Sequence, residues 1–255
     1  MMRQTDKARA WAEKLATRVG TADLERLSRS MLASIDQVSN SRWEAAVSRA
    51  GELPGAVRPE KIKALTDSFC RELGAVGAGV GAAAATPAVG TAATLFAATA
   101  ELAWFTGRAG DLVLTVAAVH GRPTPSVEER RAWMLAVLIY GSSARDGFTK
   151  AINEANTGLS TASDTRIPIS TLATMNRLLT PQLVRRYGSR RGAIALGTAL
   201  PLGIGAIVGG SANFMAVRAL ARNADEFFAR LPYSAIDTTA IDIEGVLAPD
   251  GSRSG

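Results

Sequence analysis

The feature that most constrains this chain is a run of 28 residues without a charged side chain, LGAVGAGVGAAAATPAVGTAATLFAATA, at residues 73–100. A helix that crosses a bilayer needs roughly 20 consecutive apolar residues, so the run is long enough by count. Pro87 lies near its middle, and proline lacks the helical donor and clashes with the preceding turn. Each half then forms roughly 20 Å of helix, short of the roughly 30 Å that a span requires. The run predicts a helical hairpin rather than a span.

The composition of this run supports the same interpretation. Glycine and alanine make up 17 of its 28 residues, so its insertion into lipid would be marginal. A second uncharged run, GAIALGTALPLGIGAIVGGSANFMAV at residues 192–217, also has an interior proline, Pro201. We expect both runs to form hairpins that pack through their glycines at the centre of a bundle.

Apolar residues recur at intervals of three and four along almost the whole chain, which predicts an all-α fold. Ser126, followed three residues later by Glu129, predicts a capping box that opens a helix. Thr180 followed by Pro181 predicts another helix start. We divide the chain into N-terminal amphipathic helices (1–58), a larger helical domain (59–232) and a poorly ordered tail (233–255).

Charged residues interrupt the helix expected after Pro87. Glu101, Arg108 and Asp111 follow one polar stripe, and Gly107 and Gly110 beside it predict the close approach of a neighbouring helix. In one interpretation these polar residues line a ligand pocket or a proton path. In the other, which we favour, Arg108 bridges the two carboxylates within its own helix. Asn213 lies on an apolar stripe and is expected to point into the same polar interior.

The basic residues concentrate in one place. The formal net charge is +6, which suits an anionic partner. Five arginines and no carboxylate occur in residues 177–191, and four of them form the candidate contact with membrane phosphates: Arg185, Arg186, Arg190 and Arg191. In the alternative interpretation, the arginine run is an ordinary solvent-exposed face without a partner. Nucleic acid is not an expected partner, because aromatic residues for base stacking are absent around the run.

Other chemical motifs are weak. Gly79, Gly81 and Ala84 fit the spacing G-x-G-x-x-A, but no strand precedes them, so packing is the expected role. The single histidine, His120, is expected to contact the end of its own helix. The single cysteine, Cys70, excludes an internal disulfide and suits a reducing compartment. We expect no metal site and no cofactor, and the sequence leaves open whether any reaction is catalysed.

Two blocks carry a resemblance to a known family. ATPAVGTAATLFAATAELAWFTGRAGDLVLTVAAVHGRP with EERRAWMLAVLIYG resembles the first block of EcsC family proteins, and RRGAIALGTALPLGIGAIVGGSANFMAVRALARNADEFF resembles their C-terminal block. Together they cover roughly residues 60–230, apart from residues 142–168. The resemblance implies a bacterial protein without an established biochemical activity, and it supplies no catalytic residues.

These observations lead to three functional hypotheses. The first is a non-enzymatic, cytoplasmic helical protein that associates peripherally with the inner face of the membrane through its arginines and its apolar hairpins. The second is a colicin-like protein that inserts those hairpins into lipid. The third is an enzyme or a carrier of a lipid or other hydrophobic ligand, with a pocket near Glu101. A protein partner is also compatible with the sequence.

Overall fold

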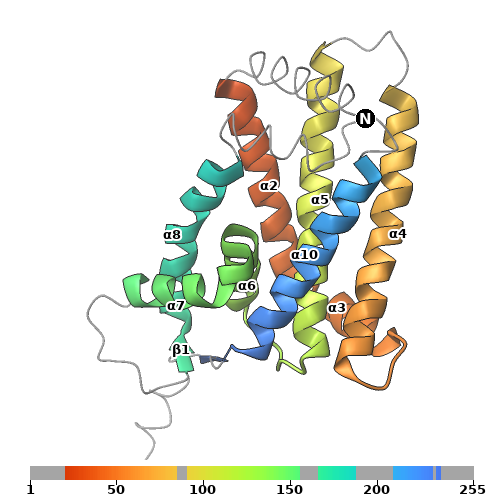
Figure 1. Cartoon of the computed structure of the whole chain (residues 1–255). Helices are drawn as coiled ribbons and strands as arrows, with labels where there is room; N and C mark the ends of the chain where they lie inside the picture. Colours follow the sequence, from red (N-terminus) through yellow and green to blue (C-terminus); the bar gives the residue numbers. More distant parts are fainter. Residues whose placement is uncertain (1–20, 85–90, 156–165, 188–208, 232–233, 237–255) are drawn as a thin grey trace, which may run out of the picture.

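The computed structural model describes residues 21–84, 91–155, 166–187, 209–231 and 234–236. This part of the chain is almost entirely helical (Figure 1), which confirms the predicted all-α class. The elements are, in chain order, α2 (Thr21–Ser41), α3 (Trp43–Glu52), α4 (Arg58–Ala84), α5 (Thr91–Val119), α6 (Val127–Tyr140), the 3₁₀ helix η1 (Gly141–Ser143), α7 (Ala144–Ala155), β1 (Arg166–Pro168), α8 (Ile169–Tyr187), α10 (Gly209–Ala229) and β2 (Ser234–Ile236).

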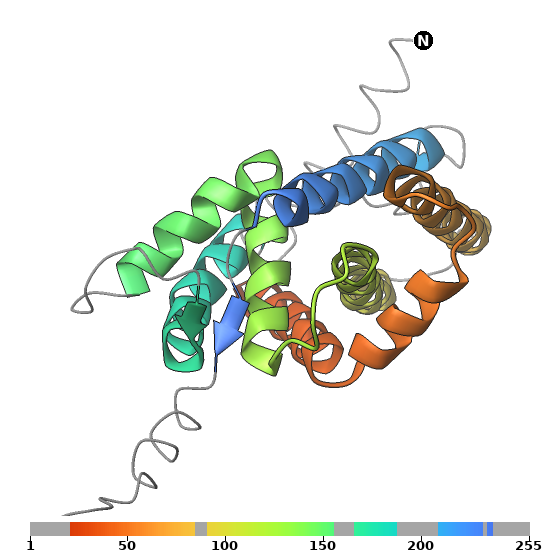
Figure 2. The same cartoon turned by 90° about the horizontal axis from the view of Figure 1, so that it is seen from below.

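Helix α5 occupies the centre of the bundle. Seen from below, it lies inside a ring formed by α2, α3, α4, α10 and α6 (Figure 2), and it contacts each of these helices. The centre is therefore one arm of the predicted first hairpin, whose helices α4 and α5 run in opposite directions on either side of Pro87. Residues 192–208, most of the second run, lie outside the described residues.

The core is built from the C-terminal half of α5 and from α6. Residues 112–117 of α5 and 132–137 of α6 are buried, and all but Thr115 are apolar. Aromatic rings from two other helices pack beside them: Trp133 of α6 packs edge to face on Phe228 of α10, and Phe148 of α7 packs in the same way on Phe227 of α10. Residues of α2 and α3, including Ile35 and Trp43, belong to the same core. The described part of residues 1–58 thus shares one core with the helices that follow.

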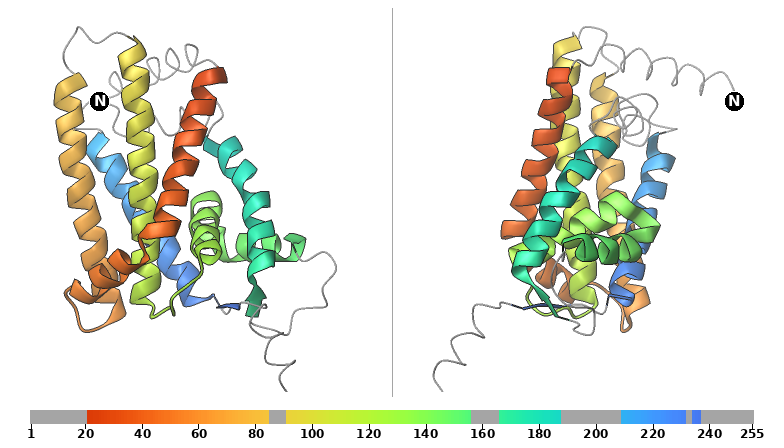
Figure 3. Two further views of the ribbon diagram at one scale, coloured as in Figure 1. Left: turned by 180° about the vertical axis from the view of Figure 1, so that it is seen from behind. Right: turned by 90° about the vertical axis from the view of Figure 1, so that its left-hand side faces the viewer.

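The beginnings of α2 and α5 and the end of α4 lie at the same end of the bundle (Figures 1 and 3). The end of α8 and the beginning of α10 point toward this end but reach less far. The uncharged sequence from Leu73 to Ala84 forms the last turns of α4, and the uncharged sequence from Thr91 to Ala100 forms the first turns of α5. We call this the uncharged end, after the turns of α4 and α5, although α2 brings Glu25 and Arg26 to it and α8 brings Arg185 and Arg186. The opposite end, toward His120, is called the charged end.

The first two described helices are interrupted at Arg42. Its backbone (φ −106°, ψ 0°) departs from helical geometry, so α2 ends at Ser41 and α3 begins at Trp43. Met31, Ile35 and Val38 recur at intervals of four and three and are buried, and an extension of this stripe predicts that Trp43 and Val47 are buried too. Trp43 is buried as predicted, but Val47 is 47% exposed. The departure from helical geometry at Arg42 explains why the stripe of α2 does not continue along α3.

Helix α8 contradicts the predicted start at Thr180. The helix runs through Pro181 without interruption, and the Thr180 hydroxyl donates to the Asn176 carbonyl within the same helix. Leu179 and Leu183 are fully buried on either side of the proline. Tertiary packing of these leucines offsets the hydrogen bond that proline cannot make.

A short parallel pair of strands was not expected from the sequence. Arg166–Pro168 of β1 pairs with Ser234–Ile236 of β2. Three residues are too few to show the alternation by which a strand is recognised. The helix predicted in residues 1–20 and most of the predicted tail lie outside the described residues.

Candidate functional site

The predicted polar stripe of α5 forms ion pairs with neighbouring helices. Arg108 Nη1 donates to Asp111 Oδ2 at 2.7 Å, which confirms the expected pair within the helix. Its Nη2 donates to Glu72 of α4. The second carboxylate bridged by Arg108 therefore comes from another helix. Glu101, the predicted partner, has a side chain outside the described part of the chain.

Two further arginines complete a chain of alternating charges. Arg42 donates to both oxygens of Asp111, at 2.9 Å from Nε and 3.0 Å from Nη2. Arg49 of α3 donates to Glu72 and, at 3.1 Å, to Ser68. We call the five residues Arg42, Asp111, Arg108, Glu72 and Arg49 the charge chain. It joins α3, α4 and α5 to the junction at which α2 ends.

The ring of Phe69 lies beneath this chain. The guanidinium carbons of Arg49 and Arg108 lie 4.4 and 4.6 Å from the ring centroid. A cation over an aromatic face is attracted by the ring quadrupole. Phe69 itself is buried, so the two arginines cover the edge of the hydrophobic core while keeping contact with their carboxylates.

The charge chain favours the ionised form of Glu72. Burial alone would raise the pKa of Glu72, but the hydrogen bonds and charges of Arg49 and Arg108 lower the pKa overall. The hydrogen bond and charge of Asp111 raise the pKa of Arg42. A carboxylate with a lowered pKa is a poor general base near neutral pH, because it has little affinity for a proton.

An open groove with a volume of about 760 Å³ lies along the charge chain. One face of α5 lines the groove, and residues of α2 and α4 line its sides. Its lining includes Val38, Arg42, Trp104, Gly107 and Arg108. Concave sites of roughly 300–1,000 Å³ are typical for small ligands.

Gly107 and Gly110 have different surroundings. A Cβ atom at Gly110 would lie 2.8 Å from Met134 Sδ and 3.0 Å from Val38 Cγ1, so the predicted close approach is confirmed there. A Cβ atom at Gly107 would meet nothing within 4 Å. The prediction was wrong for Gly107, because that position faces the open groove instead of a neighbouring helix.

Sequence reasoning missed Arg42, Arg49 and Glu72. Their partners lie 23 to 69 residues away along the chain, and local spacing cannot reveal such pairs. One signal was available for Glu72, since it is the last charged residue before the uncharged run. The side chain of Asn213, predicted to join the polar interior, lies outside the described part.

The predicted contact with membrane phosphates involves four arginines, and the structure describes two of them. Arg185 and Arg186 are exposed in the last turn of α8, and this turn lies at the uncharged end of the bundle (Figure 3). Arg190 and Arg191 lie outside the described residues. The structure thus brings Arg185 and Arg186 to the same end as the uncharged turns of α4 and α5.

His120 contacts a neighbouring helix rather than the end of its own, which corrects the prediction. Its Nε2 lies 2.7 Å from Asp225 Oδ1 of α10, and its side chain is only 5% exposed. Burial lowers the pKa of His120, although the hydrogen bond and charge of Asp225 act in the opposite direction. Nearby, Arg122 donates to the carbonyls of Phe228 and Leu231 at the end of α10. Both contacts fasten α10 to the end of α5.

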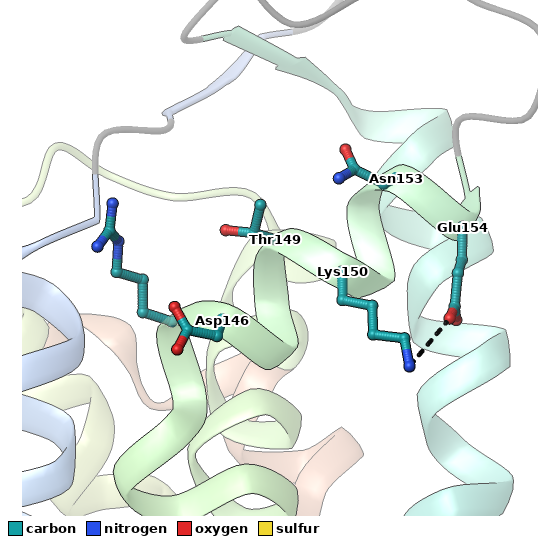
Figure 4. A pocket seen from close by; sticks show the side chains of 6 residues that line it. Asp146, Thr149, Lys150, Asn153 and Glu154 are labelled. Carbon is teal, nitrogen blue, oxygen red and sulfur yellow. Dashed lines mark ion pairs between the residues drawn. The ribbon is translucent and has the colours of Figure 1, made fainter.

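A second hollow lies on α7, but only one helix forms it. Figure 4 shows Asp146, Thr149, Lys150, Asn153 and Glu154 along successive turns, with Lys150 Nζ 3.8 Å from Glu154 Oε1. No other element contributes a lining residue. Side chains from a single helix surface do not converge on a ligand, so the groove along the charge chain is the stronger candidate.

Within residues 21–84, 91–155, 166–187, 209–231 and 234–236, no group of three or more His, Cys, Asp or Glu residues could hold a metal ion. In the same ranges, none of the helices combines the length and the apolar character needed to cross a bilayer.

Comparisons with known proteins give no relative for this chain. No family model, no curated protein and no solved structure matches it.

Proposed function

We propose that this chain is a non-enzymatic helical protein of the EcsC type that associates peripherally with the anionic, cytoplasmic face of a membrane. One observation carries the proposal: the uncharged turns of α4 and α5 and the exposed Arg185 and Arg186 lie at the same end of the bundle. Apolar sequence at the same end as cations is the combination expected of a segment that binds an anionic lipid surface.

The electrostatics support this orientation. Each basic residue near an anionic bilayer contributes about 1 kcal/mol to binding, and the net charge of +6 favours approach to such a surface. Both carboxylates of the charge chain form ion pairs with its arginines. The low pKa of Glu72 supports a structural role for that carboxylate rather than proton transfer.

Vesicle sedimentation tests the proposal. The full chain is expected to sediment with vesicles that contain phosphatidylserine, to remain in solution with pure phosphatidylcholine, and to be released by high salt. The double variant Arg185→Ala/Arg186→Ala should bind more weakly by about 2 kcal/mol, which is about thirtyfold in the partition constant. The matched control is Arg145→Ala/Lys150→Ala on α7, which also removes two exposed cations.

Two results would contradict peripheral binding through this end. Equal losses in both double variants would mean that only total charge matters. Binding that resists high salt and alkaline carbonate would favour the colicin-like alternative, in which the hairpins enter lipid.

A further inference from the structure

We propose that the groove between α2, α4 and α5 binds an amphiphile with an anionic head group. The groove is a separate site from the end of the bundle at which membrane association is proposed. Its ligand is a single molecule, with an apolar body beside Trp104 and an anionic group beside Arg42 and Arg108.

The groove is polarised along its length. The groove residues of α5 share one face of the helix, because Gly107, Arg108 and Asp111 lie three, four and seven positions after Trp104. Helix α2 runs alongside in the same direction (Figure 1), with Val38 preceding Arg42 by one turn. Trp104 and Val38 line the part nearer the uncharged end together with the polar Ser34 and Gln37, and arginines line the part nearer the charged end.

The two arginines retain donors for an anion. A guanidinium has five N–H donors. Arg42 uses its Nε and Nη2 on Asp111, and its side chain is 45% exposed. Arg108 uses its two terminal nitrogens on Asp111 and Glu72. The charge chain contains three arginines and two carboxylates, so it carries one positive charge in excess and favours an anion over a cation.

Trp104 supplies an apolar surface at the other end of the groove. The side chain of this tryptophan is partly open to solvent, and the residue is 38% exposed. An indole offers a large apolar face, and exposing it to water has a cost that a bound alkyl chain would remove.

Gly107 keeps the floor of the groove open between these two ends. No neighbouring atom requires a glycine there, and glycine inside a helix is less favourable than alanine because it loses more conformational freedom on folding. Packing therefore does not explain why position 107 is a glycine. The need to leave space for a ligand between Trp104 and Arg108 would explain it.

The test uses dodecyl phosphate below its critical micelle concentration, with binding measured by calorimetry on the full chain. We expect saturable binding to one site, and affinity at least about tenfold higher than for dodecyltrimethylammonium or inorganic phosphate. Gly107→Leu fills the groove without displacing a neighbour and should abolish binding while leaving the melting temperature unchanged or higher. Gly51→Leu is the matched control, because Gly51 is also helical with nothing within 4 Å of its Cβ position.

A second variant tests the head-group end. Arg42→Gln should remove the preference for dodecyl phosphate over dodecyl maltoside, while Asp111 retains Arg108 as its partner and the fold persists. The proposal is overturned if Gly107→Leu and Gly51→Leu bind equally well, if the cationic amphiphile binds as tightly as the anionic one, or if inorganic phosphate alone binds as tightly as dodecyl phosphate. Vesicle binding by Gly107→Leu should stay unchanged, so failure of this proposal and failure of the membrane proposal are distinguishable.

Discussion

At the scale of single residues, Gly107 and Gly110 show that two glycines on one helix can have different reasons to be there. Gly110 lies against Met134 and Val38, both of them buried. Gly107 lies against open space. Both glycines lie beside the polar stripe of α5, so the sequence gives the same prediction for each. Only the helices that surround α5 distinguish the two positions.

Alanine substitutions at these two positions should therefore have opposite effects. Gly107→Ala is expected to raise the free energy of unfolding by about 0.5–1 kcal/mol, the usual gain from replacing a helical glycine. Gly110→Ala is expected to lower it by about 1 kcal/mol, because the added methyl group overpacks the contact with Met134 and Val38. Urea denaturation followed by circular dichroism measures both. A stabilising Gly110→Ala would show that the contact yields easily.

His120 gives the protein a pH dependence at the same scale. Burial lowers its pKa in the folded state, so the unfolded chain binds the proton more readily. Stability is then complete above the unfolded pKa of about 6.5, and it decreases as the pH falls below that value. Asp225 favours protonation, while Arg58 and Arg122 oppose it.

The variant His120→Gln isolates this effect, because the chain contains no other histidine. We expect thermal stability of the unsubstituted protein to fall between about pH 6.5 and pH 5, and the profile of His120→Gln to be flatter in that window. Identical profiles would mean that burial of His120 does not control acid stability. The carboxylate Glu72, whose pKa is lowered, loses its contribution at more acidic pH.

At the scale of elements, α6 shows how a local signal and tertiary packing agree. The predicted cap is present: the Ser126 hydroxyl accepts the N–H of Glu129 at 3.1 Å. The helix that follows is buried along most of its length, including Trp133, Met134 and Leu135. Because α6 is enclosed by its neighbours, fraying at its first turn should weaken the whole fold.

Removing this cap is expected to have a measurable cost. Ser126→Ala should lower the free energy of unfolding by about 1 kcal/mol, and Ser126→Asp should preserve it, since aspartate also caps helices. Ser142→Ala, at an exposed position in η1, is the control for loss of a hydroxyl. An equal effect of the alanine variants would argue against a role for the cap.

Helix α8 shows the opposite case at this scale. Thr180 and Pro181 have the sequence of a helix start, yet α8 continues through them because Leu179 and Leu183 are held in the core. Local chemistry predicts where a helix can begin. Because the leucines on both sides of Pro181 are buried, α8 does not begin at Thr180.

At the scale of the whole molecule, the bundle separates two kinds of surface. The uncharged turns of α4 and α5 lie at one end, and the charge chain and the contact of His120 with Asp225 hold the helices together farther along. The groove runs along the charge chain, with Trp104 toward the uncharged turns and Arg42 away from them. This arrangement underlies both the membrane proposal and the amphiphile proposal.

The sequence by itself determined the all-α class, the reversal of direction between α4 and α5, the cap at Ser126 and the pair between Arg108 and Asp111. Each of these depends on residues within one or two helical turns of one another, or on the backbone chemistry of proline. Only the tertiary structure decided that Arg42, Arg49 and Glu72 complete the charge chain, that Gly107 faces a groove, and that His120 contacts Asp225. Those contacts depend on which helices become neighbours, and this is set by the packing of the whole core.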